Sequence, residues 1–260
     1  RVLYLMNKGL LLRMIGDYAG STEALEAAKN RISELSAVSV REQAGSLFIN
    51  DATKSYVGDE FEQVMVYAYL ALNYLEQHRL DDARVEALQV DILLREIAQQ
   101  VSESTYTEDA FARYLSGIIY EEQREWSDAM IAYRKAYEAY QKYASQFGLA
   151  MPDTLKHDLI RLAERMGLGE ELKLYRATFG IKEIQGVAAL RDQGELIFTL
   201  HSGLAPFKRE QSVTLVNPNN GRLMRLALPQ YLPRSQPLAH ARITIDGRSV
   251  MTSRVQDIDA

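Results

Sequence analysis

The sequence predicts a mostly α-helical protein, a solenoid of helix hairpins followed by a small β-rich C-terminal domain. Two observations predict this fold class. Apolar residues recur at three- and four-residue spacing up to about Gly180, with Pro152 as the only proline. After Gly186, alternating strand-like segments appear between turn residues. We therefore predict a helical domain over residues 1–180 and a small sandwich-like β domain over residues 181–260.

The composition excludes several classes of protein. With 260 residues and 47% hydrophobic content, the chain can form one large domain or two ordinary ones. It has no cysteine, which excludes disulfides and thiolate chemistry. No window approaches the roughly 18 to 20 consecutive apolar residues that cross a bilayer, and the apolar run at residues 9–12 ends at Arg13. Residues 1–180 carry 20 Lys and Arg against 28 Asp and Glu, and residues 181–260 carry 10 against 7, so we expect no nucleic-acid partner.

The helical part contains four repeated units. They span Tyr4–Ala28, Tyr67–Val90, Phe111–Tyr140 and Leu155–Phe179, and each has a turn between two helical segments. Ala83 and Ala129 occupy equivalent places 46 residues apart, so the helices are lengthened or extra turns are inserted relative to a 34-residue repeat. Small residues let the paired helices approach closely. In the two middle units these are Ala71, Ala83, Gly117 and Ala129.

Residues 4–179 resemble a divergent tetratricopeptide (TPR) array. Within them, Gly58–Glu62, Tyr69–Leu75 and Asp82–Ala87 are similar to a little-characterised group of bacterial envelope lipoproteins. The genes of that group tend to sit beside penicillin-binding-protein activator or curli-secretion-type lipoproteins. Gly194–Ile197 and Gly203–Lys208 extend the similarity, as does Leu228–Tyr231 with Pro233. The resemblance implies a periplasmic, outer-membrane-anchored lipoprotein without catalytic residues, and we expect its signal sequence and lipid anchor to precede Arg1.

In a tetratricopeptide array the first helix of each repeat lines an inner groove. The groove positions here are mostly apolar and lack the Lys, Arg and Asn set that clamps a peptide carboxylate. An exposed apolar groove needs cover. Either a partner's helix or extended peptide occupies it, or the protein's own segments, for instance residues 37–57, fill it. The candidate partner-binding residues are Met65, Leu72, Leu75, Glu76, Phe111, Tyr114, Ile118 and Glu121, with Ala68 and Glu122 beside them.

No side chains form a recognisable chemical motif, so we predict no catalytic residue, no metal and no cofactor. His78 falls in a repeat turn, and His157, His201 and His240 do not cluster with it. Adjacent carboxylates such as Asp81 and Asp82 point about 100° apart on a helix and do not share a site. A stripe of tyrosines favours core packing over a ligand-stacking platform. It contains Tyr133, Tyr137, Tyr140 and Tyr143.

Five strands are predicted in the C-terminal part, at about 195–201, 211–216, 222–228, 239–245 and 249–255. Asn219-Asn220-Gly221 and Asp246-Gly247 supply tight turns, and prolines at 206, 229, 233 and 237 keep the connections out of a sheet interior. These strands form a small sandwich, or a sheet completed beyond Ala260 whose open edge pairs with another chain.

These observations predict a non-enzymatic scaffold that joins proteins of the bacterial cell envelope in an envelope, secretion or peptidoglycan-related complex. The alternative is a structural subunit of a ring or homo-oligomer built through strand edges and repeat ends. A third hypothesis is a hydrolase or carbohydrate-binding module within residues 181–260.

Overall fold

The computed structural model describes residues 1–43, 56–100, 106, 108–182, 197–199, 207–216, 222–232 and 240–254. The chain divides into two compact units, one containing the helices and the other the strands. The boundary predicted between residues 180 and 181 stays a prediction, because residues 183–196 lie outside the described residues.

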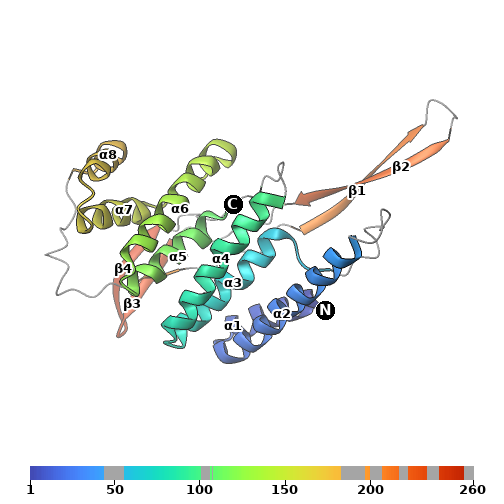
Figure 1. Ribbon diagram of the computed structural model, residues 1–260, viewed down its shortest axis with the longest axis horizontal. Coiled ribbons are helices and arrows are strands. Elements are labelled where there is room, and N and C mark those ends of the chain that lie inside the picture. The colour runs from blue at the N-terminus through green and yellow to red at the C-terminus, as the bar shows by residue number, and fades with distance from the viewer. Residues whose placement is uncertain are drawn as a thin grey trace. The chain divides into compact units, whose positions relative to one another are not determined.

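Eight helices in the described residues form four consecutive hairpins (Figure 1). The first helices are α1 (Val2–Met14), α3 (Glu60–Glu76), α5 (Ala110–Glu122) and α7 (Asp153–Arg165). The second helices are α2 (Tyr18–Gln43), α4 (Leu80–Gln100), α6 (Trp126–Phe147) and α8 (Gly169–Phe179). Each hairpin also packs against the next through α2 and α3, α4 and α5, and α6 and α7. The predicted mostly α solenoid of helix hairpins is therefore confirmed.

One turn geometry joins all four hairpins. Its central residue has a positive φ in each case: 81° at Gly16, 58° at His78, 60° at Arg124 and 71° at Gly167. The N–H of the next residue donates to a carbonyl five positions back, as from Asp17 to Leu12 at 2.9 Å. This is the hydrogen bond of a Schellman helix ending. Residues of the four hairpins can therefore be compared by counting from this turn residue. His78 is a turn residue, as predicted.

Long second helices and connections of unequal length together account for the repeat spacing. The four left-handed residues lie 62, 46 and 43 positions apart. The helices α2, α4 and α6 have 26, 21 and 22 residues. The helix bounds leave 16, 9 and 5 residues between α2 and α3, α4 and α5, and α6 and α7, so lengthened helices and additional connecting residues both contribute.

Small residues in the first helices let the paired helices pack closely in the core. In α5, Gly117 faces the ring of Tyr133 on α6, and in α1, Gly9 faces Leu25 on α2. Side chains cap the starts of α5 and α3: Asp109 accepts a hydrogen bond from the Ala112 N–H at 2.7 Å, and Glu62 accepts one from the Asp59 N–H at 2.7 Å. Tyr133 and Tyr140 are at most 1% exposed, which confirms the core-packing interpretation for these two tyrosines.

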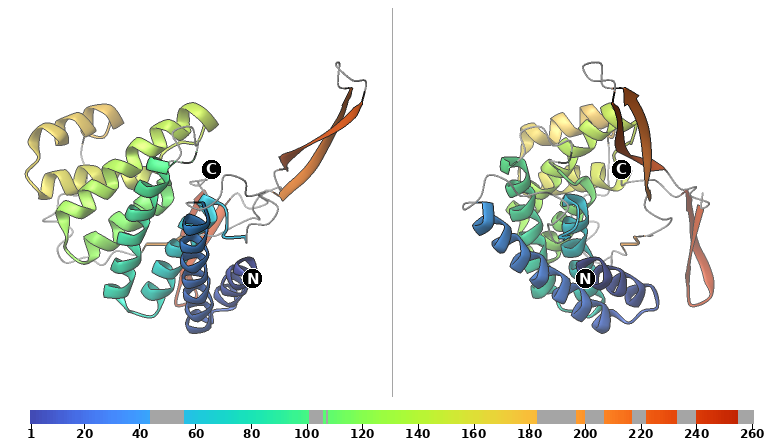
Figure 2. Two further views of the ribbon diagram at one scale, coloured as in Figure 1. Left: turned by 45° about the vertical axis from the view of Figure 1, so that its right-hand side comes forward. Right: turned by 90° about the vertical axis from the view of Figure 1, so that its right-hand side faces the viewer.

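The strand unit contains two antiparallel hairpins, seen from two further directions in Figure 2. Strands β1 (Phe207–Val216) and β2 (Leu223–Leu232) pair from Phe207 with Leu232 to Val216 with Leu223. Strands β3 (His240–Ile245) and β4 (Arg248–Arg254) are joined by Asp246 and Gly247, both with positive φ. The Asp246-Gly247 turn is thus confirmed, while the Asn219-Asn220-Gly221 turn lies outside the described residues.

Two strand predictions were wrong. Ile197–Thr199, inside the first predicted strand, form no strand. Pro229 lies within β2 opposite Glu210, although we expected it in a connection. A two-stranded ribbon accommodates this proline because alternate N–H groups of each strand point away from the partner strand. Among the described residues, four strands pair two by two and do not form the predicted five-stranded sandwich.

Candidate partner-binding surface

The predicted groove positions occupy equivalent places on α3 and α5. Counting back from the left-handed turn residues, Met65 and Phe111 lie 13 positions away, and Leu75 and Glu121 lie three away. The common turn geometry therefore brings these positions to corresponding places on the two helices.

Burial divides the candidate residues into two groups. Leu72, Phe111 and Tyr114 are 6%, 7% and 8% exposed and belong to the core, together with Ala68. Met65, Leu75 and Ile118 are half-buried, and each packs against that core while keeping part of its side chain accessible. Glu76 and Glu122 are exposed. The accessible remainder, which we call the inner-face surface, consists of Met65, Leu75, Glu76, Ile118 and Glu122.

Glu121 is held inside an ion-pair network and is not freely available. Its carboxylate accepts a hydrogen bond from the Tyr133 hydroxyl at 2.8 Å and binds both terminal nitrogens of Arg161 on α7. Arg161 also reaches Asp158 at 2.8 Å, and Asp158 accepts from the Tyr114 hydroxyl at 2.7 Å. The network joins α5, α6 and α7, which gives Glu121 a structural role that its sequence position did not reveal.

Burial and ion pairing together set the pKa values of the groups in this network. Desolvation alone would lower the pKa of Arg161, but hydrogen bonds and charge from Glu121 and Asp158 outweigh it and raise that pKa. Burial raises the pKa of Asp158, although Tyr114 and Arg161 favour its charged form. Burial also raises the pKa of Tyr133 far above its ordinary value. Arg161 therefore compensates the charges of Glu121 and Asp158, and the Tyr133 hydroxyl stays protonated at neutral pH.

Similar ion pairs join the other neighbouring hairpins. Lys29 on α2 binds Glu86 on α4 at 2.8 Å, and Tyr74 donates to Glu26 at 3.0 Å. Arg113 on α5, 3% exposed, pairs with Asp91 on α4. Because partly buried, networked pairs tolerate little rearrangement, these contacts set how each hairpin stacks on the one before it.

The structure brings no catalytic constellation together in the residues it describes. His78 and His157 are exposed on different hairpins, while His201 and the side chain of His240 lie outside the described residues. No group of three or more His, Asp or Glu side chains in the described ranges is placed to hold a metal ion. Within the same ranges, no helix has the length and apolarity to span a bilayer.

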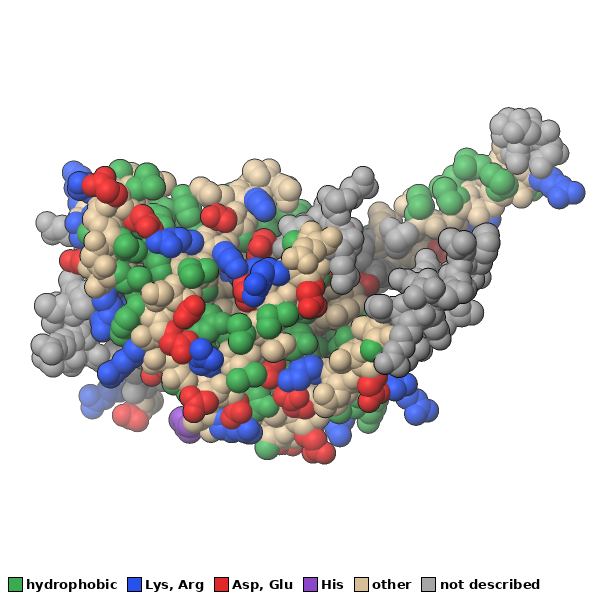
Figure 3. Space-filling view, viewed as in Figure 1, with side chains coloured by type: hydrophobic (Ala, Val, Ile, Leu, Met, Phe, Trp, Pro, Cys, Tyr) green, Lys and Arg blue, Asp and Glu red, His purple; other side chains and the backbone are tan. Residues whose placement is uncertain are grey.

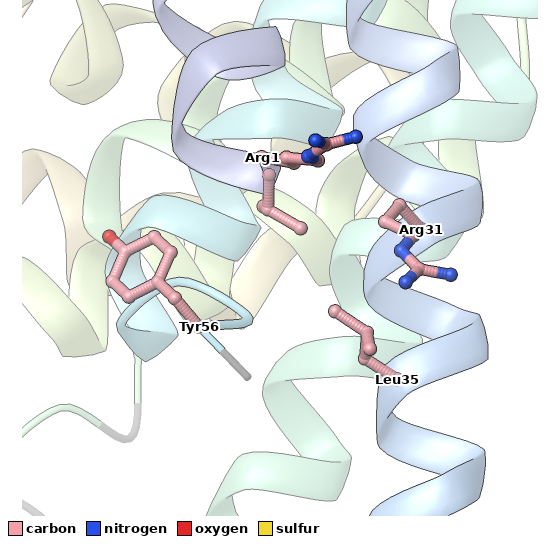
Figure 4. A pocket seen from close by; sticks show the side chains of 5 residues that line it. Arg1, Arg31, Leu35 and Tyr56 are labelled. Carbon is pink, nitrogen blue, oxygen red and sulfur yellow. The ribbon is translucent and has the colours of Figure 1, made fainter. Parts of the chain in front are cut away.

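One small cavity lies at the start of the helical unit, shown in Figure 4. It has a volume of about 180 Å³ and is lined by Arg1, Val2, Arg31, Leu35 and Tyr56. The guanidinium of Arg31 already pairs with Glu34 at 2.7 Å, so the cavity is not a dedicated anion site. The predicted filling of the groove by residues 37–57 is not tested, because residues 44–55 lie outside the described part of the chain.

The sequence matches no protein-family model and no curated protein. Among solved structures, the chain is similar to the nearly identical TPR-like repeats of a protein designated a kinesin light chain from Podosopora anserina. The identity is 13% over 73% of this chain and 81% of the other, with a TM-score of 0.43. It is also similar to BtubC (BKLC) from P. vanneervenii, at 14% identity over 74% of this chain and 85% of that one, with a TM-score of 0.36. Because these identities and TM-scores are low, we base the fold assignment on the hairpins and turns of the chain itself.

Proposed function

We propose that this chain is a non-enzymatic scaffold for protein–protein interaction in the bacterial cell envelope. The observation that carries the proposal is the inner-face surface of the stacked hairpins. It offers accessible apolar side chains, Met65, Leu75 and Ile118, bordered by the exposed carboxylates of Glu76 and Glu122. Such a surface suits an amphipathic helix or an extended peptide with basic flanks, which are common occupants of helical grooves.

Placement in the periplasm, with an outer-membrane lipid anchor, is supported by the resemblance of Gly58–Glu62, Tyr69–Leu75 and Asp82–Ala87 to envelope lipoproteins. Partners in envelope, secretion or peptidoglycan-related assembly follow from the same resemblance. Cell fractionation of the full-length gene product, combined with metabolic labelling by a radioactive fatty acid, tests both points. Recovery in the cytosol without label would contradict them.

Capture of protein partners from envelope extracts by the purified chain tests whether the inner-face surface binds them. We expect Leu75→Lys and Ile118→Lys to abolish capture of protein partners, because each places a cation in the apolar part of the surface. Ile131→Lys on α6 is the matched control, since Ile131 is 47% exposed and belongs to a second helix. Circular dichroism must show that all variants are folded. Equal capture by all of them would refute the proposal.

A second candidate function, the structural subunit of a homo-oligomer, is favoured by the β1–β2 hairpin. Val213, Leu215, Leu226 and Leu228 share one face and are 44–52% exposed. Figure 3 shows hydrophobic side chains, in green, along that hairpin. The opposite face carries the pair between Glu210 and Arg225, with the exposed Val216 and Leu223 at one end of the hairpin. A lone two-stranded hairpin is marginally stable, so pairing with a second copy would stabilise it.

Light scattering at high protein concentration distinguishes this homo-oligomer function from the scaffold function, because it measures the mass of the particle in solution. We expect an oligomer that Val213→Lys combined with Leu226→Lys dissociates into monomers. A wild-type monomer at all concentrations would exclude it.

A further inference from the structure

Polar side chains hold the contact of α2 with α3 and α4, which we call the first joint. Among the described residues, Leu25 is the one buried residue of the first hairpin in the large apolar cluster that spans the other three hairpins. Beside it, the buried amide of Asn73 donates to the Ser21 hydroxyl at 2.8 Å. The amide of Gln77 donates to the Thr22 hydroxyl at 2.9 Å. Such hydrogen bonds replace hydrogen bonds to water, so we expect the first joint to open at lower cost than the apolar contacts elsewhere.

A cluster of charges crosses the first joint. The ammonium of Lys29 on α2 binds Glu26 on the same helix and Glu86 on α4, both at 2.8 Å. The Tyr74 hydroxyl on α3 donates to Glu26 at 3.0 Å. The Lys29 ammonium lies 5.8 Å from the centre of the Tyr67 ring, also on α3. Two carboxylates therefore share one ammonium, and the cluster has one negative charge in excess when all three groups are ionised.

Glu86 is the incompletely paired member of this cluster. It is 3% exposed, and its Oε2 atom has no hydrogen-bond partner among the described residues. The buried carboxylates of Asp109 and Asp158 differ, because each accepts hydrogen bonds at both oxygens. A charged oxygen that is buried without a partner costs free energy, and protonation of the carboxyl removes that cost. Protonation of Glu86 also removes the excess charge of the cluster.

The surroundings of Glu86 decide how pH acts on the first joint. Burial raises the pKa of Glu86 above its ordinary value of 4.5, and the charges of Glu26 and Asp82 act in the same direction. The hydrogen bond and charge of Lys29 oppose this rise without cancelling it. A carboxyl with a higher pKa in the closed joint than in the open joint binds its proton more tightly when the joint is closed. The closed joint is therefore most stable below pH 4.5 and loses stability as the pH rises through the raised pKa.

We propose that the first joint is a pH-sensitive switch, in which protonation of Glu86 holds the first hairpin closed and its ionisation lets that hairpin open. The other groups packed against Glu86 from α3 keep their charge state over this range. The hydroxyls of Tyr67 and Tyr74 stay protonated, because burial raises the pKa of each. The Cζ of Arg79 lies 4.6 Å from the centre of the Tyr74 ring, and its guanidinium is always cationic.

Hydrogen exchange of the full chain, followed by mass spectrometry and corrected for the intrinsic pH dependence of amide exchange, tests the proposal. We expect α2 to open more often than α6 in the wild type, and its opening to increase about threefold or more between about pH 5 and about pH 7.5. Glu86→Gln mimics the neutral carboxyl, so it should abolish this increase and keep α2 closed at both pH values. Lys29→Met removes the cation of the cluster and should enlarge the increase.

Two further variants complete the experiment. Glu96→Gln makes the same substitution at an exposed position of α4 and should retain the wild-type pH dependence. Glu26→Gln leaves Lys29 to Glu86 alone, so it should reduce the increase, and it tests the proposal even if Glu86→Gln does not fold. Opening of α2 that is independent of pH in the wild type would overturn the proposal. So would a wild-type pH dependence in Glu86→Gln, or equal opening of α2 and α6 at both pH values.

Discussion

Gly117 on α5 lies against the ring of Tyr133 on α6, so closely that a Cβ at position 117 would be 2.3 Å from two ring carbons. Tyr133 is 1% exposed and is anchored by its hydrogen bond to Glu121, so the ring has little freedom to move away. The absent side chain of Gly117 therefore sets the distance between the two helices of the third hairpin.

Gly117→Ala is expected to lower the free energy of unfolding by about 2 kcal/mol, because overpacking outweighs the gain of about 1 kcal/mol in helix propensity. Gly169→Ala, at the start of α8 with no atom within 4 Å of the added Cβ, is the control and should be neutral or stabilising. Urea unfolding measures both. Equal stability of the two variants would show that α5 and α6 separate without cost.

The two non-glycine turns should gain stability from glycine. His78 and Arg124 have φ of 58° and 60° and are exposed, so glycine relieves backbone strain without removing a buried contact. We expect His78→Gly and Arg124→Gly each to raise the free energy of unfolding by about 0.5–1 kcal/mol. Gly167→Ala, where no atom lies within 4 Å, should lower it by about 1 kcal/mol. A gain from Gly167→Ala would contradict the shared turn geometry.

Asp91 should make stability depend on pH. Burial favours its neutral form, but hydrogen bonds from Lys135 and Arg113 outweigh burial, and the pKa of Asp91 lies below its ordinary value. A lowered carboxyl pKa contributes stability that is present above the unfolded pKa and is lost as pH falls through the folded pKa. Asp91→Asn should cost about 2 kcal/mol at pH 7, because Arg113 remains buried with one partner fewer.

Unfolding of wild type and Asp91→Asn at several pH values measures this effect. The difference in free energy of unfolding should be largest near neutrality and shrink below about pH 4, near the ordinary pKa of an aspartate. The control is Asp82→Asn, since the side chain of Asp82 is 46% exposed and its ion pair in the described structure is with the exposed Arg79. A pH-independent difference for Asp91→Asn would argue against an ionised Asp91 as the source of stability.

Glu121→Gln separates structural from binding roles at a predicted groove position. It leaves the guanidinium of Arg161, 18% exposed, without its carboxylate partner across the helices, and should cost about 2 kcal/mol. Arg161→Met combined with Glu121→Gln should cost less than the sum of the single changes. Capture of partners by the folded variant should equal that of wild type. Reduced capture without loss of stability would return Glu121 to the binding surface.

The sequence alone determined the repeated architecture. Small residues such as Ala71 and Gly117 and the turn at His78 define helix hairpins through contacts a few residues apart, and those contacts are encoded locally. The Asp246-Gly247 turn was predictable for the same reason, since its backbone needs two positive φ angles.

Only the tertiary structure decided which face of each helix remains accessible. Leu72, Phe111 and Tyr114 occupy groove positions by periodicity, yet packing within the helical unit covers them. Glu121 pairs with Arg161, 40 residues away. The periodicity of apolar residues shows which side chains share a face of a single helix. Burial and charge pairing depend on how hairpins that are distant in sequence stack on one another.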